Sequence, residues 1–389
     1  MMKLAERVAK IEYAIRDVVG PATKLENKGI EVLKLNIGDP VKFDFQTPPH
    51  MIEALCTAAK DNMNFYGPSE GLLQLREAIS RREKRLNRRS VDPSQVITTN
   101  GISEAISMLF GSLVEKGDEI LVPGPTYPPY MAYTKFFGGE PVSYRTIEEA
   151  GWVPDIQDLE KKITDKTRAI VLINPNNPTG AVYPEKALKE VADVAARHNV
   201  LLISDEIYDE MIFDRDHSNF PITDAPMVIV NGFSKVYLST GWRIGYGIFC
   251  NCEDLKEAVL KQARIRLCAN TLCQVAAAIA LDGSQEHIPK IVDKLKKRRD
   301  FAWKRLNEIE GVYASKPEGA FYIFPRIPTD NDKKFVIDLL SEKHVLFVHG
   351  SGFCPTYGKG HLRSVFLPTI DVLEEAYNRL EDFIVSRSS

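Results

Sequence analysis

The chain lacks any long apolar run. No segment approaches the roughly 18 to 20 consecutive apolar residues that a membrane helix needs. The first residues do not form a secretory signal peptide, because charged residues such as Glu6 and Asp17 interrupt any apolar core. We therefore expect a cytoplasmic protein that has no membrane partner.

Cysteine and histidine are also scarce. Six cysteines scattered through 389 residues do not form a disulfide framework, and the neighbours Cys250 and Cys252 have no second pair close by. The seven histidines show no zinc-binding spacing. The sequence thus predicts free thiols and no metal site.

A strong charge of either sign is missing as well. The formal net charge of −3 gives no general attraction to nucleic acid, so we expect no nucleic-acid partner. A basic cluster near the end of a predicted helix is typical of a solvated helix terminus. Its members are Arg81, Arg82, Lys84, Arg85, Arg88 and Arg89.

The chain does have the length and apolar content for more than one domain. It contains 389 residues, of which 44% are hydrophobic. Seven short β-branched segments alternate mostly with helical patterns, which predicts an α/β fold with a largely parallel seven-stranded sheet flanked by helices. The predicted strands are Val96–Thr99, Glu119–Val122, Val142–Tyr144, Ala169–Ile173, Leu201–Ser204, Val228–Val230 and Ile244–Phe249.

The pattern changes after about residue 250. Two long helical stretches, Glu253–Leu281 and His287–Ile309, precede three further strand candidates, which together predict a smaller α+β domain. The strand-like segment Val32–Leu35 is expected to pack with that domain. We predict a large domain at 46–285 and a small domain at 1–45 and 286–389. The three late strand candidates are Ala320–Phe324, Val345–Val348 and Leu362–Phe366.

Several polar residues follow the predicted strand ends, where ligands bind in sheets of this kind. Lys235, Asp205 and Arg243 form a combination that can hold pyridoxal phosphate. A lysine amine can bond to the cofactor aldehyde, a carboxylate can keep the pyridine nitrogen protonated, and an arginine can bind the phosphate. Glycine spacing excludes a dinucleotide fingerprint at 350–355 and a P-loop at 352–359.

Longer motifs extend this interpretation. The segments NPNNPTG, SDEIYDE, NGFSKVYLSTGWRIGY and HLRSVFLP occur in the order and spacing of one enzyme family. Across nearly its full length the chain resembles a class I/II aminotransferase of the fold-type I pyridoxal phosphate enzymes. The segments LKLNIGDPVKFDF, VPGPTYPPY and VLFVHGSGF are similar to microbial alanine aminotransferases.

The resemblance implies a role for each cofactor-binding residue. Lys235 would be the catalytic residue, first bonded to the cofactor and then acting as the base. Asp205 would pair with the ring nitrogen, and Asn177 and Tyr208 with the phenolic oxygen. Tyr127 would stack on the ring. The phosphate would be bound by Gly101, Ile102, Ser103, Ser234 and Arg243, and by Tyr66 of the neighbouring subunit in a homodimer.

The substrate residues follow from the same resemblance. Arg363 would grip the α-carboxylate, lined by Gly38 and Asn177, and Tyr13 and Arg16 would close over the substrate. An amphipathic surface helix explains Tyr13 and Arg16 nearly as well. Structural roles also remain open for the others, namely a helix cap for Asp205, a turn for Asn177, and core aromatics for Tyr127 and Tyr66.

The sequence thus predicts amino transfer between an L-amino acid, with alanine favoured, and 2-oxoglutarate. Aspartate, aromatic and branched-chain donors stay open, since no clear second arginine exists for a distal carboxylate; Arg264 and Arg266 are candidates. A pyridoxal phosphate C–S lyase would use the same cofactor residues. A non-catalytic regulator is disfavoured because no helix-turn-helix pattern precedes the large domain.

Overall fold

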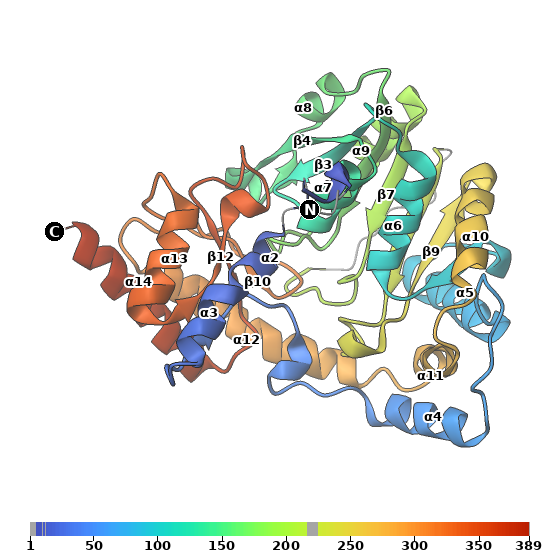
Figure 1. Ribbon diagram of the computed structural model, residues 1–389, viewed down its shortest axis with the longest axis horizontal. Coiled ribbons are helices and arrows are strands. Elements are labelled where there is room, and N and C mark those ends of the chain that lie inside the picture. The colour runs from blue at the N-terminus through green and yellow to red at the C-terminus, as the bar shows by residue number, and fades with distance from the viewer. Residues whose placement is uncertain (1–4, 10, 12, 216–224, 389) are drawn as a thin grey trace.

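An eight-stranded mixed sheet forms the centre of the computed structural model, which describes residues 5–9, 11, 13–215 and 225–388 (Figure 1). The strand order is β2-β9-β8-β7-β6-β3-β4-β5. The bounds are β2 Val96–Thr99, β3 Glu119–Gly124, β4 Glu140–Ile147, β5 Val153–Pro154, β6 Thr167–Ile173, β7 Leu201–Asp205, β8 Met227–Gly232 and β9 Gly245–Cys250.

The seven predicted strands are confirmed, but the predicted total of seven was wrong by one. Strands β4, β3, β6, β7 and β8 run parallel, and β9 is antiparallel to both β8 and β2. The additional strand, β5, is a two-residue antiparallel partner of β4 at the sheet edge. It is too short for a periodic pattern and contains Pro154, which sheets tolerate at an edge.

Alternate residues of the strands pack into separate cores on the two faces of the sheet. Ile120 and Val122 point into one core and Leu121 into the other, as expected for strands buried on both sides. One face is covered by α6 Ile102–Leu113, α7 Pro128–Phe136 and α10 Glu253–Arg266. Helices packed on the other side are α5 Leu73–Asn87, α8 Ile156–Lys161 and α9 Glu185–His198, and α5 in turn packs on α11 Thr271–Asp282, which contacts α4 Pro49–Lys60.

A smaller α+β unit adjoins the large sheet (Figure 1). Its three-stranded sheet has the order β10-β13-β12, and a separate two-stranded sheet pairs β1 in parallel with β11, so the N-terminal segment packs against the C-terminal part. The bounds are β1 Leu33–Lys34, β10 Tyr322–Ile323, β11 Val345–Leu346, β12 Val348–His349, β13 Leu362–Val365, α2 Ala14–Asp17, α3 Val19–Glu26, α12 His287–Asn307, α13 Asp332–Lys343 and α14 Ile370–Ser388. Helix α1 Glu6–Ala9 instead contacts α7 of the large sheet.

The predicted helical stretch Glu253–Leu281 is two helices rather than one. The chain leaves α10 at Leu267, whose φ of 78° is incompatible with a continuing right-handed helix. Asn270 then starts α11, since its side-chain oxygen accepts the backbone N–H of Cys273 at 3.0 Å. Within the described ranges, no helix is both long and apolar enough to cross a bilayer.

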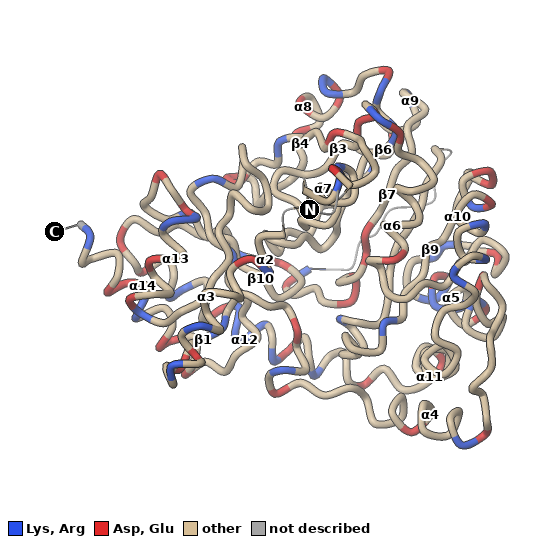
Figure 2. The backbone as a smooth tube through the Cα atoms, viewed as in Figure 1, with Lys and Arg blue, Asp and Glu red and all other residues tan. Residues whose placement is uncertain are grey.

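The prediction of a solvated basic helix terminus was wrong for two of its six residues. Arg82 and Arg89 are buried. Arg82 contacts Asp209 at 2.8 Å, and Arg89 contacts Glu206 at 2.8 Å and Glu83 at 2.9 Å. Arg82 and Arg89 stand among other basic residues of the same segment (Figure 2), so the linear pattern did not separate the two buried arginines from their exposed neighbours.

Candidate functional site

A cavity of about 510 Å³ lies at the carboxyl ends of the central strands and is closed on its other side by the smaller unit. The structure brings most of the predicted site residues to this cavity. Those that line it are Tyr13, Arg16, Gly38, Ile102, Ser103, Tyr127, Asn177, Asp205, Tyr208, Ser234, Lys235, Arg243 and Arg363.

Lys235 follows β8 and is half-buried in the cavity. Its Nζ donates to the carbonyl oxygen of Gly38 at 2.6 Å and lies 5.6 Å from the centre of the Phe321 ring. Burial lowers the pKa of Lys235 to about 8, and the positive charges of Arg363 and Arg243 act in the same direction while Asp39 opposes them. The amine is therefore far closer to its neutral, nucleophilic form at physiological pH than an exposed lysine.

Asp205 is the last residue of β7, and its pKa is shifted in the opposite direction to that of Lys235. Burial raises the pKa of its carboxyl group to about 6, although the Tyr130 hydroxyl donates to Oδ2 at 2.7 Å and the Ile207 N–H to Oδ1 at 3.2 Å. Among the described residues it has no cationic partner. A cationic group bound in the cavity would therefore pair with a buried carboxylate that two hydrogen-bond donors already orient.

The start of α6 and Arg243 form a corner suited to an anion. Gly101 precedes α6 with a φ of 78° and has no side chain to cap the helix, so the first N–H groups of α6 are left for a ligand. A Cβ at Gly101 would lie 2.8 Å from Cζ of Arg243, which requires glycine there. Arg243 itself has a φ of 55° and donates to the carbonyl oxygen of Thr240 at 3.1 Å.

Arg363, on β13, is a buried cation without an anionic partner among the described residues. Nη1 donates to Oδ1 of Asn177 at 3.0 Å and Nη2 to the carbonyl oxygen of Asn36, while Nε has no acceptor in the described ranges. The guanidinium carbon lies 4.6 Å from the Tyr322 ring centre and 4.8 Å from that of Phe353. Burial lowers the pKa of Arg363. Such a cation is stabilised by a bound carboxylate.

Residues from the N-terminal segment complete the cavity wall. The hydroxyl groups of Tyr13 and Tyr127 lie 3.4 Å apart, and Ile15 lines the same wall. Arg16 lines the cavity while remaining exposed, and no hydrogen bond or ion pair of its side chain is found in the described part. Tyr13 and Arg16 thus both line the cavity, and their closure over a substrate stays a prediction beside the alternative of an amphipathic surface helix.

Four of the candidate residues do not line the cavity of their own chain, namely Gly101, which directly precedes α6, and Tyr66, Arg264 and Arg266. Tyr66 is 81% exposed on the loop before α5. Arg264 and Arg266, considered for a distal carboxylate, instead contact Glu257 and Glu104 at 2.8 Å and 2.7 Å. Both arginines are therefore engaged within the large sheet's helices.

Sequence reasoning missed several residues of the cavity. Tyr322 lines it and Tyr130 contacts Asp205 from behind, yet both lie in apolar segments where an aromatic residue gives no signal beyond core packing. Asp39 and Thr240 also line it and bond to each other at 2.8 Å. Of these four missed residues, only Asp39 is adjacent in sequence to a predicted site residue, Gly38.

These groups fit pyridoxal phosphate. The cavity offers a half-buried lysine of lowered pKa, a buried carboxylate without a cation among the described residues, and a helix N-terminus beside Arg243. The orphaned Nε of Arg363 adds a place for a carboxylate. Fold and site together define a pyridoxal phosphate-dependent enzyme.

Comparisons with known proteins define the family. The profile of aminotransferase class I and II matches residues 30–380, and the chain belongs to this family of pyridoxal phosphate-dependent transaminases. A solved alanine aminotransferase from Pyrococcus furiosus is 53% identical, with a TM-score of 0.96 over 99% of this chain and 100% of the other.

Two curated relatives are also named as aminotransferases. The alanine aminotransferase of Mycobacterium tuberculosis is 39% identical, with 97% of this chain and 92% of that protein covered. The glutamate-pyruvate aminotransferase AlaA of Escherichia coli is 36% identical over 98% of each.

Proposed function

We propose that the protein transfers an amino group between L-alanine and 2-oxoglutarate. The observation that carries the proposal is one cavity lined by both Lys235, with its lowered pKa, and Arg363, whose guanidinium has no anionic partner among the described residues. An amino acid presents an amino group and a carboxylate to just such a pair. Alanine is favoured because the similar proteins described above carry alanine and pyruvate in their names.

The cofactor would be held by residues from five segments. Ser234, Arg243 and the N-terminus of α6, at Gly101, Ile102 and Ser103, would bind its phosphate. Asp205 would accept the ring N–H, Asn177 and Tyr208 would donate to the phenolic oxygen, and Tyr127 would cover the ring face. When bound, pyridoxal phosphate supplies a carbonyl carbon that takes up the amino group and a ring that withdraws electrons from Cα.

The chain's own residues supply proton transfer and orientation. Lys235 Nζ, once free, would take the proton from the substrate Cα and return it, and its lowered pKa brings it close to the working pH. Arg363 would fix the α-carboxylate with two charge-assisted hydrogen bonds, and the Gly38 backbone and Asn177 would complete that site. This orientation decides which bond at Cα is presented to Lys235.

Arg16 would allow the same cavity to accept both partners. Its exposed guanidinium at the cavity wall has no described partner, so it can meet the distal carboxylate of 2-oxoglutarate or stay solvated when alanine is bound. Tyr13 and Ile15, beside it, limit the room for a larger apolar side chain. Aspartate, aromatic and branched donors, and C–S lyase chemistry, are the competing outcomes.

A homodimer in the cytoplasm is part of the proposal. Tyr66 and Phe65 are exposed on a loop that a hydrogen bond from Thr271 Oγ1 to the Phe65 carbonyl oxygen, at 2.8 Å, ties to the start of α11. Ile265 and Leu267 are exposed at the nearby end of α10, and Arg266 donates to Ser69 of the same loop. A second copy would cover this apolar surface and bring Tyr66 to the neighbouring cofactor phosphate.

A donor screen tests the function. With 2-oxoglutarate as acceptor, we expect kcat/KM for alanine to exceed that for aspartate and for aromatic and branched donors, with glutamate and pyruvate formed in equal amounts. Release of ammonia from a cysteine conjugate in place of glutamate formation would support the lyase alternative. A tenfold preference for aspartate would overturn the alanine assignment and leave the family intact.

The variant Arg16→Gln sharpens the same experiment. It removes the charge and leaves a shorter, polar side chain, so KM for 2-oxoglutarate should rise roughly tenfold or more while KM for alanine changes little. Equal KM changes for both substrates would show that Arg16 does not contact the distal carboxylate.

A further inference from the structure

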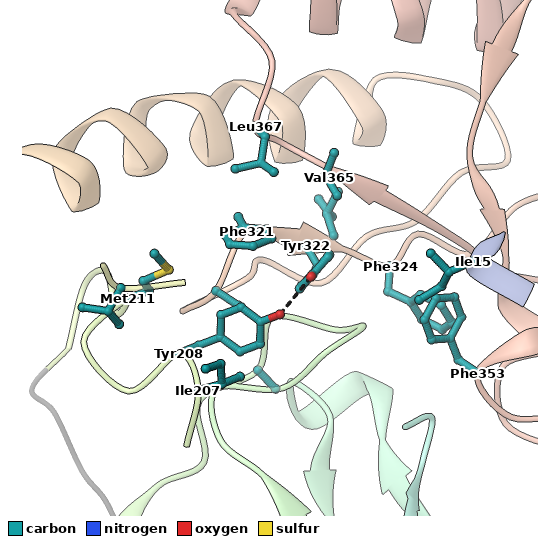
Figure 3. Close-up of a cluster of buried hydrophobic side chains, with 14 of the residues drawn as sticks. Ile15, Ile207, Tyr208, Met211, Phe321, Tyr322, Phe324, Phe353, Val365 and Leu367 are labelled. Atoms are coloured by element: carbon teal, nitrogen blue, oxygen red, sulfur yellow. Dashed lines mark hydrogen bonds between the residues drawn. The ribbon is translucent and has the colours of Figure 1, made fainter. Parts of the chain in front are cut away.

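Tyr322 belongs to neither the proposed cofactor residues nor the proposed carboxylate residues, yet it touches both. It lies on β10, is 2% exposed and lines the cavity. Its hydroxyl lies 2.8 Å from the hydroxyl of Tyr208, which follows β7 (Figure 3). Its ring centre lies 4.6 Å from the guanidinium carbon of Arg363. One side chain thus joins the two ends of the site.

Sheet pairing and packing fix this position. Tyr322 pairs with Val365 on β13, the strand that carries Arg363, so tyrosine and arginine belong to one small sheet. Its ring packs at 90° on the Tyr208 ring, with the centres 5.7 Å apart. A Cβ at Gly38 would lie 2.9 Å from Cζ of Tyr322 and nearer still to its hydroxyl. Glycine at that position therefore leaves room for the tyrosine.

A count of hydrogens shows what the hydroxyl pair can do. Each tyrosine has one hydroxyl hydrogen to donate, and either may be the donor of the Tyr208–Tyr322 bond. If Tyr208 donates to Tyr322, Tyr208 has no hydrogen left to donate to a ligand oxygen. If Tyr322 donates to Tyr208, the Tyr208 hydrogen stays available, and accepting a bond makes Tyr208 a stronger donor.

We propose that Tyr322 is a positioning residue for both ends of the site. Its hydroxyl donates to Tyr208 and so directs the Tyr208 hydrogen to the phenolic oxygen of the cofactor. Its ring holds the Arg363 guanidinium for the substrate carboxylate. The inference rests on the proposed function for the roles of Tyr208 and Arg363, and it adds a mechanical link between them through one buried side chain.

Two kinds of substitution separate the hydroxyl from the ring. Tyr322→Phe keeps the ring and removes the donor, whereas Tyr322→Leu and Tyr322→Met both remove the aromatic face, so the ring test does not depend on one substitution. The holoenzyme without substrate is titrated with pH while the visible absorbance of the bound cofactor is followed. Propionate, which carries a carboxylate and no amino group, measures the carboxylate site by competitive inhibition.

We expect Tyr322→Phe to raise the pH midpoint of the absorbance change by about 0.3 to 1 pH unit. The midpoint should rise because a weaker donor at the phenolic oxygen lets the cofactor hold its proton to higher pH. Tyr208→Phe should shift the midpoint in the same direction and by a larger amount. Propionate inhibition should stay within about twofold of wild type. The ring-free variants should weaken propionate roughly tenfold.

The double variant Tyr208→Phe/Tyr322→Phe tests the linkage itself. If Tyr322 acts through Tyr208, the double variant has the midpoint of Tyr208→Phe alone. Tyr144→Phe is the matched control, because Tyr144 is also fully buried and its hydroxyl donates to the Val171 carbonyl oxygen at 2.8 Å, outside the cavity. It should leave both readouts at their wild-type values.

Three results would overturn the inference: an unchanged midpoint in Tyr322→Phe, a further shift of equal size in the double variant, or unchanged propionate inhibition without the ring. A shift shared with Tyr144→Phe would also overturn it, because any lost buried hydroxyl would then have the same effect. The pH midpoint requires no amino transfer, and propionate inhibition is measured with whichever amino donor reacts in the donor screen. Failure of the alanine assignment is therefore distinguishable from failure of this proposal.

Discussion

At the scale of single residues, burial moves two titratable groups of the cavity toward each other in pKa. Asp205 rises to about 6 and Lys235 falls to about 8, each chiefly because its charged form is removed from water. Neither has an oppositely charged partner in an ion pair among the described residues. Each shift is a cost in folding that a bound cofactor would offset.

This cost is measurable for Asp205. Between pH 3.8 and about 6 the folded cofactor-free protein holds a proton that the unfolded chain has released, so wild-type stability falls as the pH rises through that window. Asparagine does not titrate and can still accept from Tyr130. The stability of Asp205→Asn relative to wild type should therefore increase from pH 4 to pH 7 by on the order of 2–3 kcal/mol.

Urea unfolding of the cofactor-free proteins at both pH values measures this difference, with the exposed Asp165→Asn as the control. The same Asp205→Asn protein should lose pyridoxal phosphate faster on dialysis. A stability difference independent of pH would contradict the assignment of a buried, desolvated carboxylate.

At the scale of elements, the strand ends position the site, and this was predictable from sequence. Buried β-branched segments followed by polar residues located Asp205 and Lys235, because ligands bind beyond the carboxyl ends of parallel strands. The short edge strand β5 and the break at Leu267 were not predictable, since both depend on local backbone geometry. Tyr322 also escaped prediction, because an aromatic in a short strand gives the same pattern whether it faces core or cavity.

The burial of Arg82, in α5, and of Arg89, just after it, was likewise not predictable from the sequence. Arg89 contacts Glu206 and Glu83 across 117 and 6 residues of sequence, and such a network forms only when the fold brings the end of α5 to the residue that follows β7. Glu206 adjoins Asp205, so the network supports the strand end that carries the site. Because Arg89 is close in sequence to the exposed Lys84, the sequence pattern did not indicate that Arg89 supports this strand end.

The variant Arg89→Ala should destabilise the protein by about 3–5 kcal/mol, because it leaves Glu206 buried without its cation and Glu83 with Arg82 alone. The exposed Lys84→Ala, from the same basic cluster, should change stability by about 0.5 kcal/mol or less. Thermal unfolding of both holoenzymes provides the comparison. Similar small effects from the two substitutions would restore the interpretation of a solvated helix end.

At the scale of the whole molecule, the cavity forms where the large sheet and the smaller unit meet. Arg363 comes from β13 of the smaller unit, and Lys235 follows β8 of the large sheet. Pairing of β1 with β11 brings the N-terminal segment to the same place. The predicted boundaries, 46–285 for one domain and 1–45 with 286–389 for the other, remain predictions.

The proposed homodimer makes a prediction about hybrids. Mixing Tyr66→Phe chains with Lys235→Ala chains gives dimers in which one site takes Lys235 from the first chain and Tyr66 from the second. Activity assayed at limiting cofactor should rise on subunit exchange. Mixing Lys235→Ala with Asp205→Ala is the control. Each of these substitutions lies in the site of the chain that carries it, so one hybrid site lacks Lys235, the other lacks Asp205, and neither is intact. Absence of a rise after verified exchange would place Tyr66 outside the partner's site.

The central claim is that this cavity moves an amino group from alanine to 2-oxoglutarate, and nitrogen labelling tests it most directly. Purified holoenzyme is given alanine labelled with nitrogen-15 and unlabelled 2-oxoglutarate, and the products are identified by mass spectrometry. The account predicts labelled glutamate and pyruvate in a one-to-one ratio, both lost in Lys235→Ala. Label appearing in free ammonia, or no labelled glutamate while another donor reacts readily, would contradict it.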